Sequence, residues 1–167
     1  MYLNVRIKGL DRAMESLSFF RVRLQRTAPL MEEIGRILEV SVRHNFAAGG
    51  RPRRWVPSKR ALREGNLTLV DTGLLASSIS SCARDGEVSV GTDVPYAAVH
   101  QFGARAGSLG RAVVRSRRRL ANGRLAPGRR RVVPIPFGDI PARPFLVVLE
   151  EDKAAIVEAV NRFLEPG

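Results

Sequence analysis

The sequence contains few of the residues that form covalent cross-links, metal sites or aromatic binding platforms. Its 167 residues include one cysteine (Cys82), two histidines (His44 and His100), one tryptophan and two tyrosines. A lone cysteine cannot form an internal disulfide, and one cysteine with two histidines is too small a set for a typical zinc site. We therefore predict no disulfide, no metal site and no cofactor, and folding in a reducing cytoplasm.

Long apolar runs are also missing. No window approaches the roughly eighteen apolar residues that a membrane-spanning helix requires. The first ten residues contain Arg6 and Lys8 and lack the apolar centre of a secretory signal. We expect a soluble protein that does not contact a membrane.

Acidic residues are absent from one long segment. Between Arg105 and Arg131 there are ten arginines and no aspartate or glutamate. A second basic stretch covers Arg51–Arg63, and elsewhere acids and bases nearly balance. The formal net charge of +12 and the pI near 11.4 therefore come from these two places.

Clustered arginine favours a polyanionic partner, because binding to phosphate releases condensed counterions. Residues 103–133 contain no aromatic side chain on which a base could stack, so contact with nucleic acid would be non-specific. Arginine also matches the carboxylates of acidic protein surfaces. Composition alone leaves both kinds of partner open.

The first half of the chain shows clear hydrophobic periodicity. Residues 3–7 alternate between apolar and polar, which indicates a strand. Apolar residues at helical spacing predict a helix over about 11–25, with Asp11 as its cap, and a longer one over 29–48 that ends at Gly49. Residues 51–59 have two prolines and no period, so we predict an irregular loop pinned by Trp55.

The second half shows shorter patterns. We predict a short helix that is capped by Asp71 or Thr72 and carries Leu74, Leu75 and Ile79. A strand through Val88 and Val90, a helix or strand over 94–103, an apolar strand over 144–149 and a last helix from Glu151 follow. The predicted fold is α+β: a single domain over residues 1–167, mainly an antiparallel sheet packed by two or three helices.

The arginine-rich segment contains its own hairpin signal. Asn122-Gly123 favours a two-residue turn, and this turn sets Leu120 opposite Leu125, Arg115 opposite Arg130 and Val113 opposite Val132. Opposed like charges destabilise such a ladder, and a lone two-stranded ribbon is marginal in water. Ordering a residue also costs about 1 to 2 kcal/mol. We therefore predict an inserted arm over residues 104–131 that a partner outside the domain holds in place; a solvated, irregular loop is the alternative.

Candidate catalytic groups are few. Residues 69–73 (LVDTG) are similar to the signature of dimeric aspartic proteases, in which Asp71 would be catalytic. Leu74 and Leu75 follow at helical spacing, however, and a helix cap explains the same residues. Neither histidine has a serine, cysteine or carboxylate at a spacing typical of a nucleophile and base. We predict no catalytic residues and no enzymatic activity; the protease remains a third hypothesis.

Four segments in order resemble one protein family. They are HNFAAGGRPRRWVPS (44–58), LVDTGLLASSIS (69–80), VSVGTDVPYAAVHQFG (88–103) and IPARPFLVV (140–148). Together they are similar to the virion morphogenesis, or tail-completion, proteins of Mu-like and P2-like bacteriophages, with patterns such as L-x-x-T-G-x-L-x-x-S-I and Y-A-x-x-H-Q-x-G. The similarity covers most of the chain outside residues 1–30 and 104–131.

The resemblance implies a structural virion protein of the head-tail junction or tail end, of the neck, tail-completion or tail-terminator type. Such a protein would join head to tail as a homo-oligomeric ring, which we expect to contain six copies. Its partners would be other neck and tail proteins, and genomic DNA in the channel would be a non-specific contact. Assembly would take place in the host cytoplasm and the product would reside in the virion.

These expectations assign roles to particular residues. The predicted subunit or partner interface consists of Arg111, Arg115, Arg117, Arg118, Arg119, Arg124, Arg129, Arg130 and Arg131, and the predicted DNA-facing residues are Arg51, Arg53 and Arg54. The structural motif residues are Trp55, Thr72, Gly73, Tyr96, His100, Gln101, Phe102, Gly103, Pro141, Arg143, Pro144 and Phe145. The alternative function is a free protein that binds nucleic acid non-specifically through the arginine-rich arm.

Overall fold

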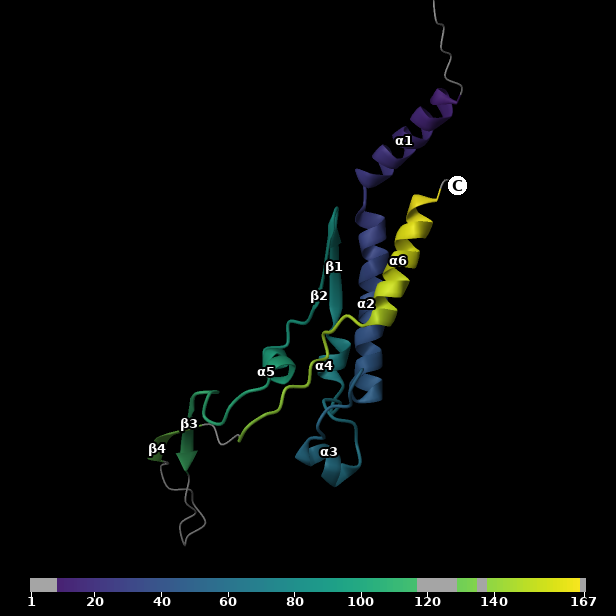
Figure 1. Cartoon of the computed structure of the whole chain (residues 1–167). Helices are drawn as coiled ribbons and strands as arrows, with labels where there is room; N and C mark the ends of the chain where they lie inside the picture. Colours follow the sequence, from purple (N-terminus) through teal and green to yellow (C-terminus); the bar gives the residue numbers. More distant parts are fainter. Residues whose placement is uncertain (1–8, 117–128, 135–137, 166–167) are drawn as a thin grey trace, which may run out of the picture.

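The computed structural model describes residues 9–116, 129–134 and 138–165 (Figure 1). The elements of these residues, in chain order, are α1 (Leu10–Leu24), α2 (Ala28–Ala48), α3 (Lys59–Glu64), α4 (Leu74–Ser77), β1 (Ser80–Arg84), β2 (Glu87–Gly91), α5 (Ala97–Phe102), β3 (Arg111–Ser116), β4 (Arg129–Pro134) and α6 (Glu150–Leu164). Both strand pairs are antiparallel, β1 with β2 and β3 with β4. This mixture of helices and antiparallel strands confirms the predicted α+β class.

Helix α2 is the central element. Pro29 lies in its first turn and Gly49 ends it in a left-handed conformation, as the sequence predicts. Its buried side, which includes Leu30, Ile34 and Phe46, contacts the β1–β2 ribbon and α6 (Figure 1). The helix therefore joins the N-terminal and C-terminal parts of the chain.

The β1–β2 ribbon lies close against α2. Its two-residue turn, Asp85-Gly86, is bonded to the start of the helix: the Asp85 carboxylate accepts from the amide of Ala28 at 2.7 Å, and the Thr27 hydroxyl accepts from the amide of Gly86 at 2.7 Å. A Cβ at Gly35 would lie 2.7 Å from the Ser81 hydroxyl oxygen. Only glycine allows this approach of helix and ribbon.

The sheet in the structure is smaller than the one that the sequence predicts. The predicted strand over 144–149 is wrong, because this segment pairs with no strand among the described residues. Its backbone groups bond to side chains instead, as described below. The short elements β1 and α3 lie where no strand or helix was predicted.

Most predicted helices lie where the sequence places them. Helix α1 matches the helix predicted over 11–25, although it begins after Gly9 and Asp11 lies in its first turn. Helix α4 buries Leu75 and is followed by buried Ile79, but Leu74 is exposed.

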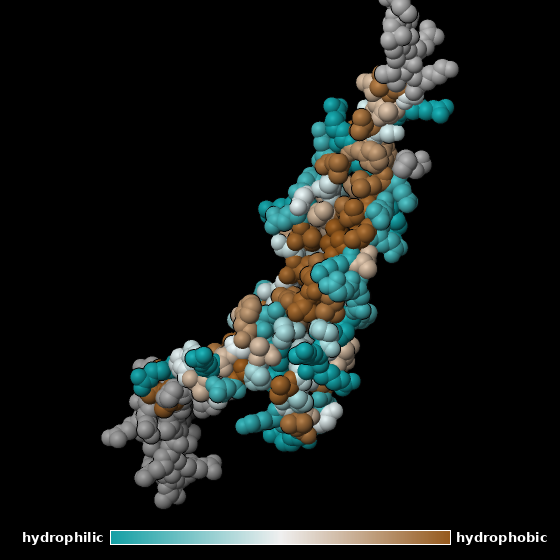
Figure 2. All heavy atoms as spheres, in the orientation of Figure 1, coloured by the Kyte–Doolittle hydropathy of each residue, from teal (hydrophilic) through white to brown (hydrophobic). Residues whose placement is uncertain are grey.

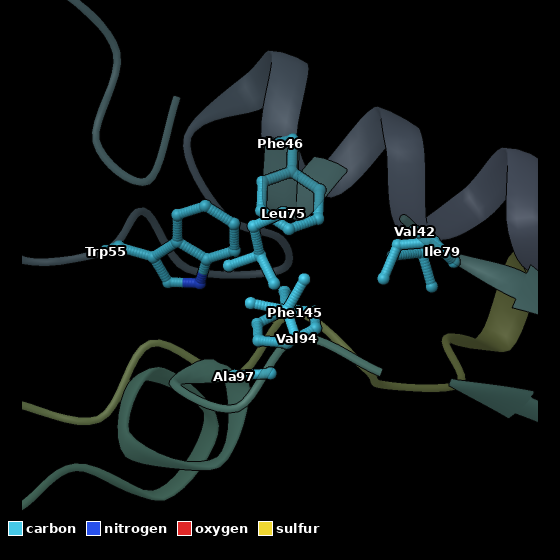
Figure 3. Close-up of a cluster of buried hydrophobic side chains, with 8 residues drawn as sticks. All are labelled: Val42, Phe46, Trp55, Leu75, Ile79, Val94, Ala97 and Phe145. Atoms are coloured by element: carbon cyan, nitrogen blue, oxygen red, sulfur yellow. The ribbon is translucent and has the colours of Figure 1, made fainter. Parts of the chain in front are cut away.

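The main core joins segments that are far apart in sequence. It contains Val42, Phe46, Trp55, Leu75, Ile79, Val94, Ala97 and Phe145 (Figure 3). The Phe46 ring lies 5.7 Å from the Trp55 ring, nearly perpendicular to it, and 5.3 Å from the Phe145 ring. These aromatic contacts connect α2, the loop after it and the segment before α6.

Two parts extend away from this core, α1 at one end and the β3–β4 pair at the other (Figure 1). The register of β3 and β4 sets Val113 opposite Val132 and Arg115 opposite Arg130, as predicted. The predicted pair of Leu120 with Leu125, the turn and most of the arm lie outside the described residues, so the complete arm stays a prediction. The strand predicted over 3–7 also lies outside them.

Candidate functional site

The segment Pro141–Leu149, here called the clamped segment, passes through the core without a strand partner, and Gln101 holds its centre. The Gln101 side-chain oxygen accepts from the amides of Phe145 at 2.9 Å and Leu146 at 3.0 Å. Its side-chain nitrogen donates to the Leu146 carbonyl at 3.0 Å. One side chain on α5 therefore replaces a neighbouring strand.

Three further side chains hold the same segment. The Trp55 indole donates to the Pro144 carbonyl at 3.1 Å, and the Asn45 amide donates to the Phe145 carbonyl at 2.9 Å. In the opposite direction, the Arg143 guanidinium donates to the Val56 carbonyl at 2.8 Å, and its backbone amide donates to the His100 carbonyl at 2.7 Å. Phe145 is 0% exposed at the centre of these bonds.

Arg51 belongs to this internal network. Its guanidinium donates to the Asn45 side-chain oxygen at 2.9 Å and to the carbonyl and hydroxyl of Ser41 at 2.7 and 3.0 Å, and it pairs with Glu151. A side chain with these four contacts is engaged within the chain. Among the predicted DNA-facing residues, Arg51 is therefore partly buried and paired, whereas Arg53 and Arg54 are exposed, and DNA contact stays a prediction for this set.

Five of the predicted motif residues line one hollow of about 420 Å³. Thr72 and Gly73 come from the start of α4, Tyr96 and His100 from α5, and Arg143 from the clamped segment. Ser58, the last residue of the first motif segment, also lines the hollow, so all four motif segments meet at one place. Asp71 and Arg60 also line the hollow, and their charged groups lie 3.4 Å apart.

His100 is the polar group with the most unusual surroundings in this hollow. Its Nδ1 atom is buried and has no hydrogen-bond partner among the described residues. Burial, and then the positive charge of Arg143, lower the pKa of His100 below its ordinary value of 6.5. The imidazole is therefore neutral at pH 7, and its ring packs edge-on against Tyr96, with centroids 5.8 Å apart.

Gly103 ends α5 and allows a close backbone crossing. Its φ is +77°, and a Cβ here would lie 2.7 Å from the carbonyl oxygen of Ile140. Ala104 and Ile140 exchange backbone hydrogen bonds of 2.9 and 2.8 Å at this crossing. The crossing joins the clamped segment to the base of β3–β4, where Phe102 is 78% exposed and makes no core contact.

The structure describes some of the remaining predicted site residues but not all of them. Pro141 and Pro144 lie in the clamped segment, and Arg111 is exposed at the start of β3. Arg115, Arg129, Arg130 and Arg131 lie in the β3–β4 ladder. Arg117, Arg118, Arg119 and Arg124 lie outside the described residues.

The chemistry of the hollow is that of a polar contact site. No group of three His, Cys, Asp or Glu side chains in the described part of the chain could hold a metal ion. Asp71 is largely exposed beside Arg60, and the hydroxyl of Thr72 accepts from the amide of Leu74 at 3.3 Å, as expected for a helix start.

Among the described helices, none is long and apolar enough to cross a membrane.

Sequence analysis missed several residues of the site. Asn45 is 0% exposed and lies between Val42 and Phe46 on the buried side of α2. A polar residue at a core position of an amphipathic helix is the signal that indicates such a buried hydrogen bond. Arg60, which bonds to Glu64 and to the carbonyls of Leu67 and Val70, carries no comparable signal.

Comparison with known proteins agrees with the motifs. Residues 5–165 match the phage virion morphogenesis family. The chain is 38% identical over 138 residues to the "Mu-like prophage FluMu G protein 2" of Haemophilus influenzae, a match that covers 83% of this chain and 78% of that protein. No solved structure matches the chain. The order of the motifs and the extent of this match show that the chain belongs to the phage virion morphogenesis family.

Proposed function

We propose that this protein is a neck or tail-completion component that forms a closed ring of six copies and joins the phage head to the tail. Membership of the virion morphogenesis family supports a structural role in the virion. The ring, its place at the head-tail junction or tail end, and the contacts with other neck and tail proteins are the proposed part.

The shape of the chain carries this proposal. The β3–β4 pair lies away from the helices and the core (Figure 1). Like charges face each other where Arg115 lies opposite Arg130, which weakens the ladder. A lone two-stranded ribbon is marginal in water. An adjacent subunit with acidic residues would pack against the ribbon, and its carboxylates would pair with the arginines of the ribbon.

The base of the ribbon adds an apolar contact. Phe102 is 78% exposed beside the crossing of Ala104 and Ile140. Exposed aromatic side chains next to arginine are typical of the central residues of protein interfaces. We propose that Phe102 and Arg111 lie in the same subunit contact.

A shortened variant tests the ring. Arg111 and Pro134 face each other in the ladder, so their Cα atoms are about 5 Å apart and an Asn-Gly turn can replace residues 112–133. We expect this variant to keep the helical content of the wild type by circular dichroism but to remain monomeric by light scattering, whereas the wild type forms rings. A ring made by the shortened variant, or a monomeric wild type, would contradict the proposal.

Exposed Arg53 and Arg54 keep nucleic-acid binding as the second candidate. Under that function the shortened variant loses duplex DNA binding at about 50 mM salt while its assembly is unchanged, and wild-type affinity falls steeply toward 200 mM. Arg53→Ala with Arg54→Ala is the companion variant, because it removes two predicted DNA-facing charges while the ribbon stays intact, and under nucleic-acid binding it should also weaken DNA affinity. Under the ring proposal this variant still assembles.

A further inference from the structure

Helix α1 has an apolar side on which none of the described residues of its own chain packs closely. Leu10, Met14, Leu17 and Leu24 recur at steps of four, three and seven residues, and all four are more than half exposed. We call these residues the α1 stripe. No residue of α1 is buried. An isolated helix of fifteen residues is marginal in water and usually depends on the packing of its apolar side.

The same chain has an open apolar face. The second core cluster buries only Leu30, Ile34 and Ala159. The partly buried apolar residues around them, here called the open face, are Met31, Ile37, Leu38, Val88, Ile156, Val160 and Phe163. Figure 2 shows an apolar surface that continues from α1 over α2, between β1 and α6. A continuous apolar surface of this kind marks an interaction site in a soluble protein.

Helix α1 is held away from its own open face. The Arg23 guanidinium lies 4.8 Å from the centre of the Phe19 ring and 5.4 Å from that of Phe163, and it donates to the Phe163 carbonyl. These contacts fix the C-terminal end of α1 at the C-terminal end of α6. The rest of α1 extends beyond the helix pair (Figure 1).

The charges of the two surfaces are complementary. Helices α2 and α6 together carry seven acidic and four basic residues, although the whole chain has a net charge of +12. Residues 10–27, which contain α1 and its connection to α2, carry four basic and two acidic residues. When two copies of this chain approach each other, a segment with a small positive charge therefore meets a helix pair with a negative charge.

We propose that α1 of one copy packs its stripe on the open face of a second copy. The stripe supplies aliphatic side chains along about 22 Å of helix, and the open face supplies an apolar surface formed by α2, α6 and Val88 of β2. Each copy gives one helix and receives one, so the contact repeats from subunit to subunit. The proposal rests on the proposed function only for the presence of several copies, because it does not involve the β3–β4 arm.

Disulfide cross-linking tests the contact directly in the full chain. In a Cys82→Ser background, one protein carries Leu17→Cys and a second, with a different tag, carries Leu38→Cys. We expect mild oxidation to give a mixed dimer of the two proteins. A Glu15→Cys protein is the matched control, because Glu15 lies on the polar side of α1 and should not cross-link to Leu38→Cys.

A chain with both Leu17→Cys and Leu38→Cys, oxidised at low concentration, separates the alternatives. A cross-link within one chain would mean that α1 folds back on its own open face, and this result would overturn the proposal. Absence of any Leu17 to Leu38 cross-link, or Leu17 to Leu17 products alone, would also overturn it.

A charge substitution gives the second measurement. Leu17 is 67% exposed, so Leu17→Asp should leave the unfolding temperature unchanged. We expect self-association to weaken by about tenfold to a hundredfold, the equivalent of one buried leucine. Glu15→Ala should have no such effect. If Leu17→Asp assembles normally while the chain shortened at 112–133 does not, this inference fails and the ring proposal stands.

Discussion

The clamped segment and the β3–β4 pair are both stretches of chain without a full sheet around them, yet their polar groups are satisfied in opposite ways. In the clamped segment, Gln101, Trp55 and Asn45 bond to backbone groups around buried Phe145. In β3–β4 the strands bond to each other, and Arg115 faces Arg130. One segment is completed within the chain, and the other presents charge to its surroundings.

This difference separates stability from assembly. Substitutions at the clamped segment remove contacts that the folded monomer already makes, so they should change the free energy of unfolding. Substitutions at exposed positions near β3–β4 or on α1 should change association and leave unfolding nearly untouched. Three predictions test this separation, from the largest expected effect to the smallest.

Two phenylalanines give the sharpest contrast. Phe145→Ala removes a fully buried ring between Phe46 and the rest of the core, so we expect a loss of about 3 to 5 kcal/mol, enough to unfold a domain of ordinary stability. Phe102→Ala removes a ring that is 78% exposed and should cost less than about 0.5 kcal/mol. Urea denaturation measures both values, and equal losses would contradict the division between core and contact surface.

The two glutamines of the chain give the next contrast. Gln101→Ala leaves the amides of Phe145 and Leu146 and the carbonyl of Leu146 without partners, and we expect a loss of about 3 kcal/mol. Gln25→Ala, at the exposed end of α1, should be close to neutral. Urea titrations measure the free energy of unfolding of both variants. If Gln101→Ala leaves this free energy unchanged, water replaces the hydrogen bonds of the Gln101 side chain.

The pH dependence of stability gives the smallest effect. Because the pKa of His100 is lowered in the folded chain, the unfolded chain binds a proton more readily once the pH falls below about 6.5. Stability should therefore be complete above pH 6.5 and decrease as the pH falls from there toward the lower folded pKa. His100→Gln should reduce this decrease between pH 7.5 and 5.5 in urea titrations. An identical pH profile for wild type and His100→Gln would show that burial of this imidazole has no energetic consequence.

Local patterns predicted several elements accurately. The boundaries of α2 follow from Pro29 and Gly49, and the apolar spacing of residues 11–25 indicated α1. From Asn122-Gly123 the sequence analysis predicted a register in which Arg115 pairs with Arg130, and the described strands have this register. These features depend on residues that are close in sequence, so a pattern in the chain is enough to locate them.

Other features were predicted incorrectly or missed because their partners are far away in sequence. The apolar run over 144–149 is typical of a buried strand, but buried Phe145 is held by Gln101 and Asn45 rather than by another strand. Arg51 belongs to a basic stretch, yet a carboxylate a hundred residues away, on Glu151, pairs with it. The β1–β2 ribbon did have a local signal in Asp85-Gly86, which the sequence analysis passed over.

The sequence by itself determined the long helices α1, α2 and α6, the register of the β3–β4 pair, the uneven distribution of charge and, through its four motifs, the family. Only the tertiary structure decided which polar side chains are used inside the molecule and which remain available to partners. The physical reason is that periodicity and turn residues act between near neighbours, whereas the bonds of Gln101, Arg51 and Arg143 join segments that meet only after the chain has folded.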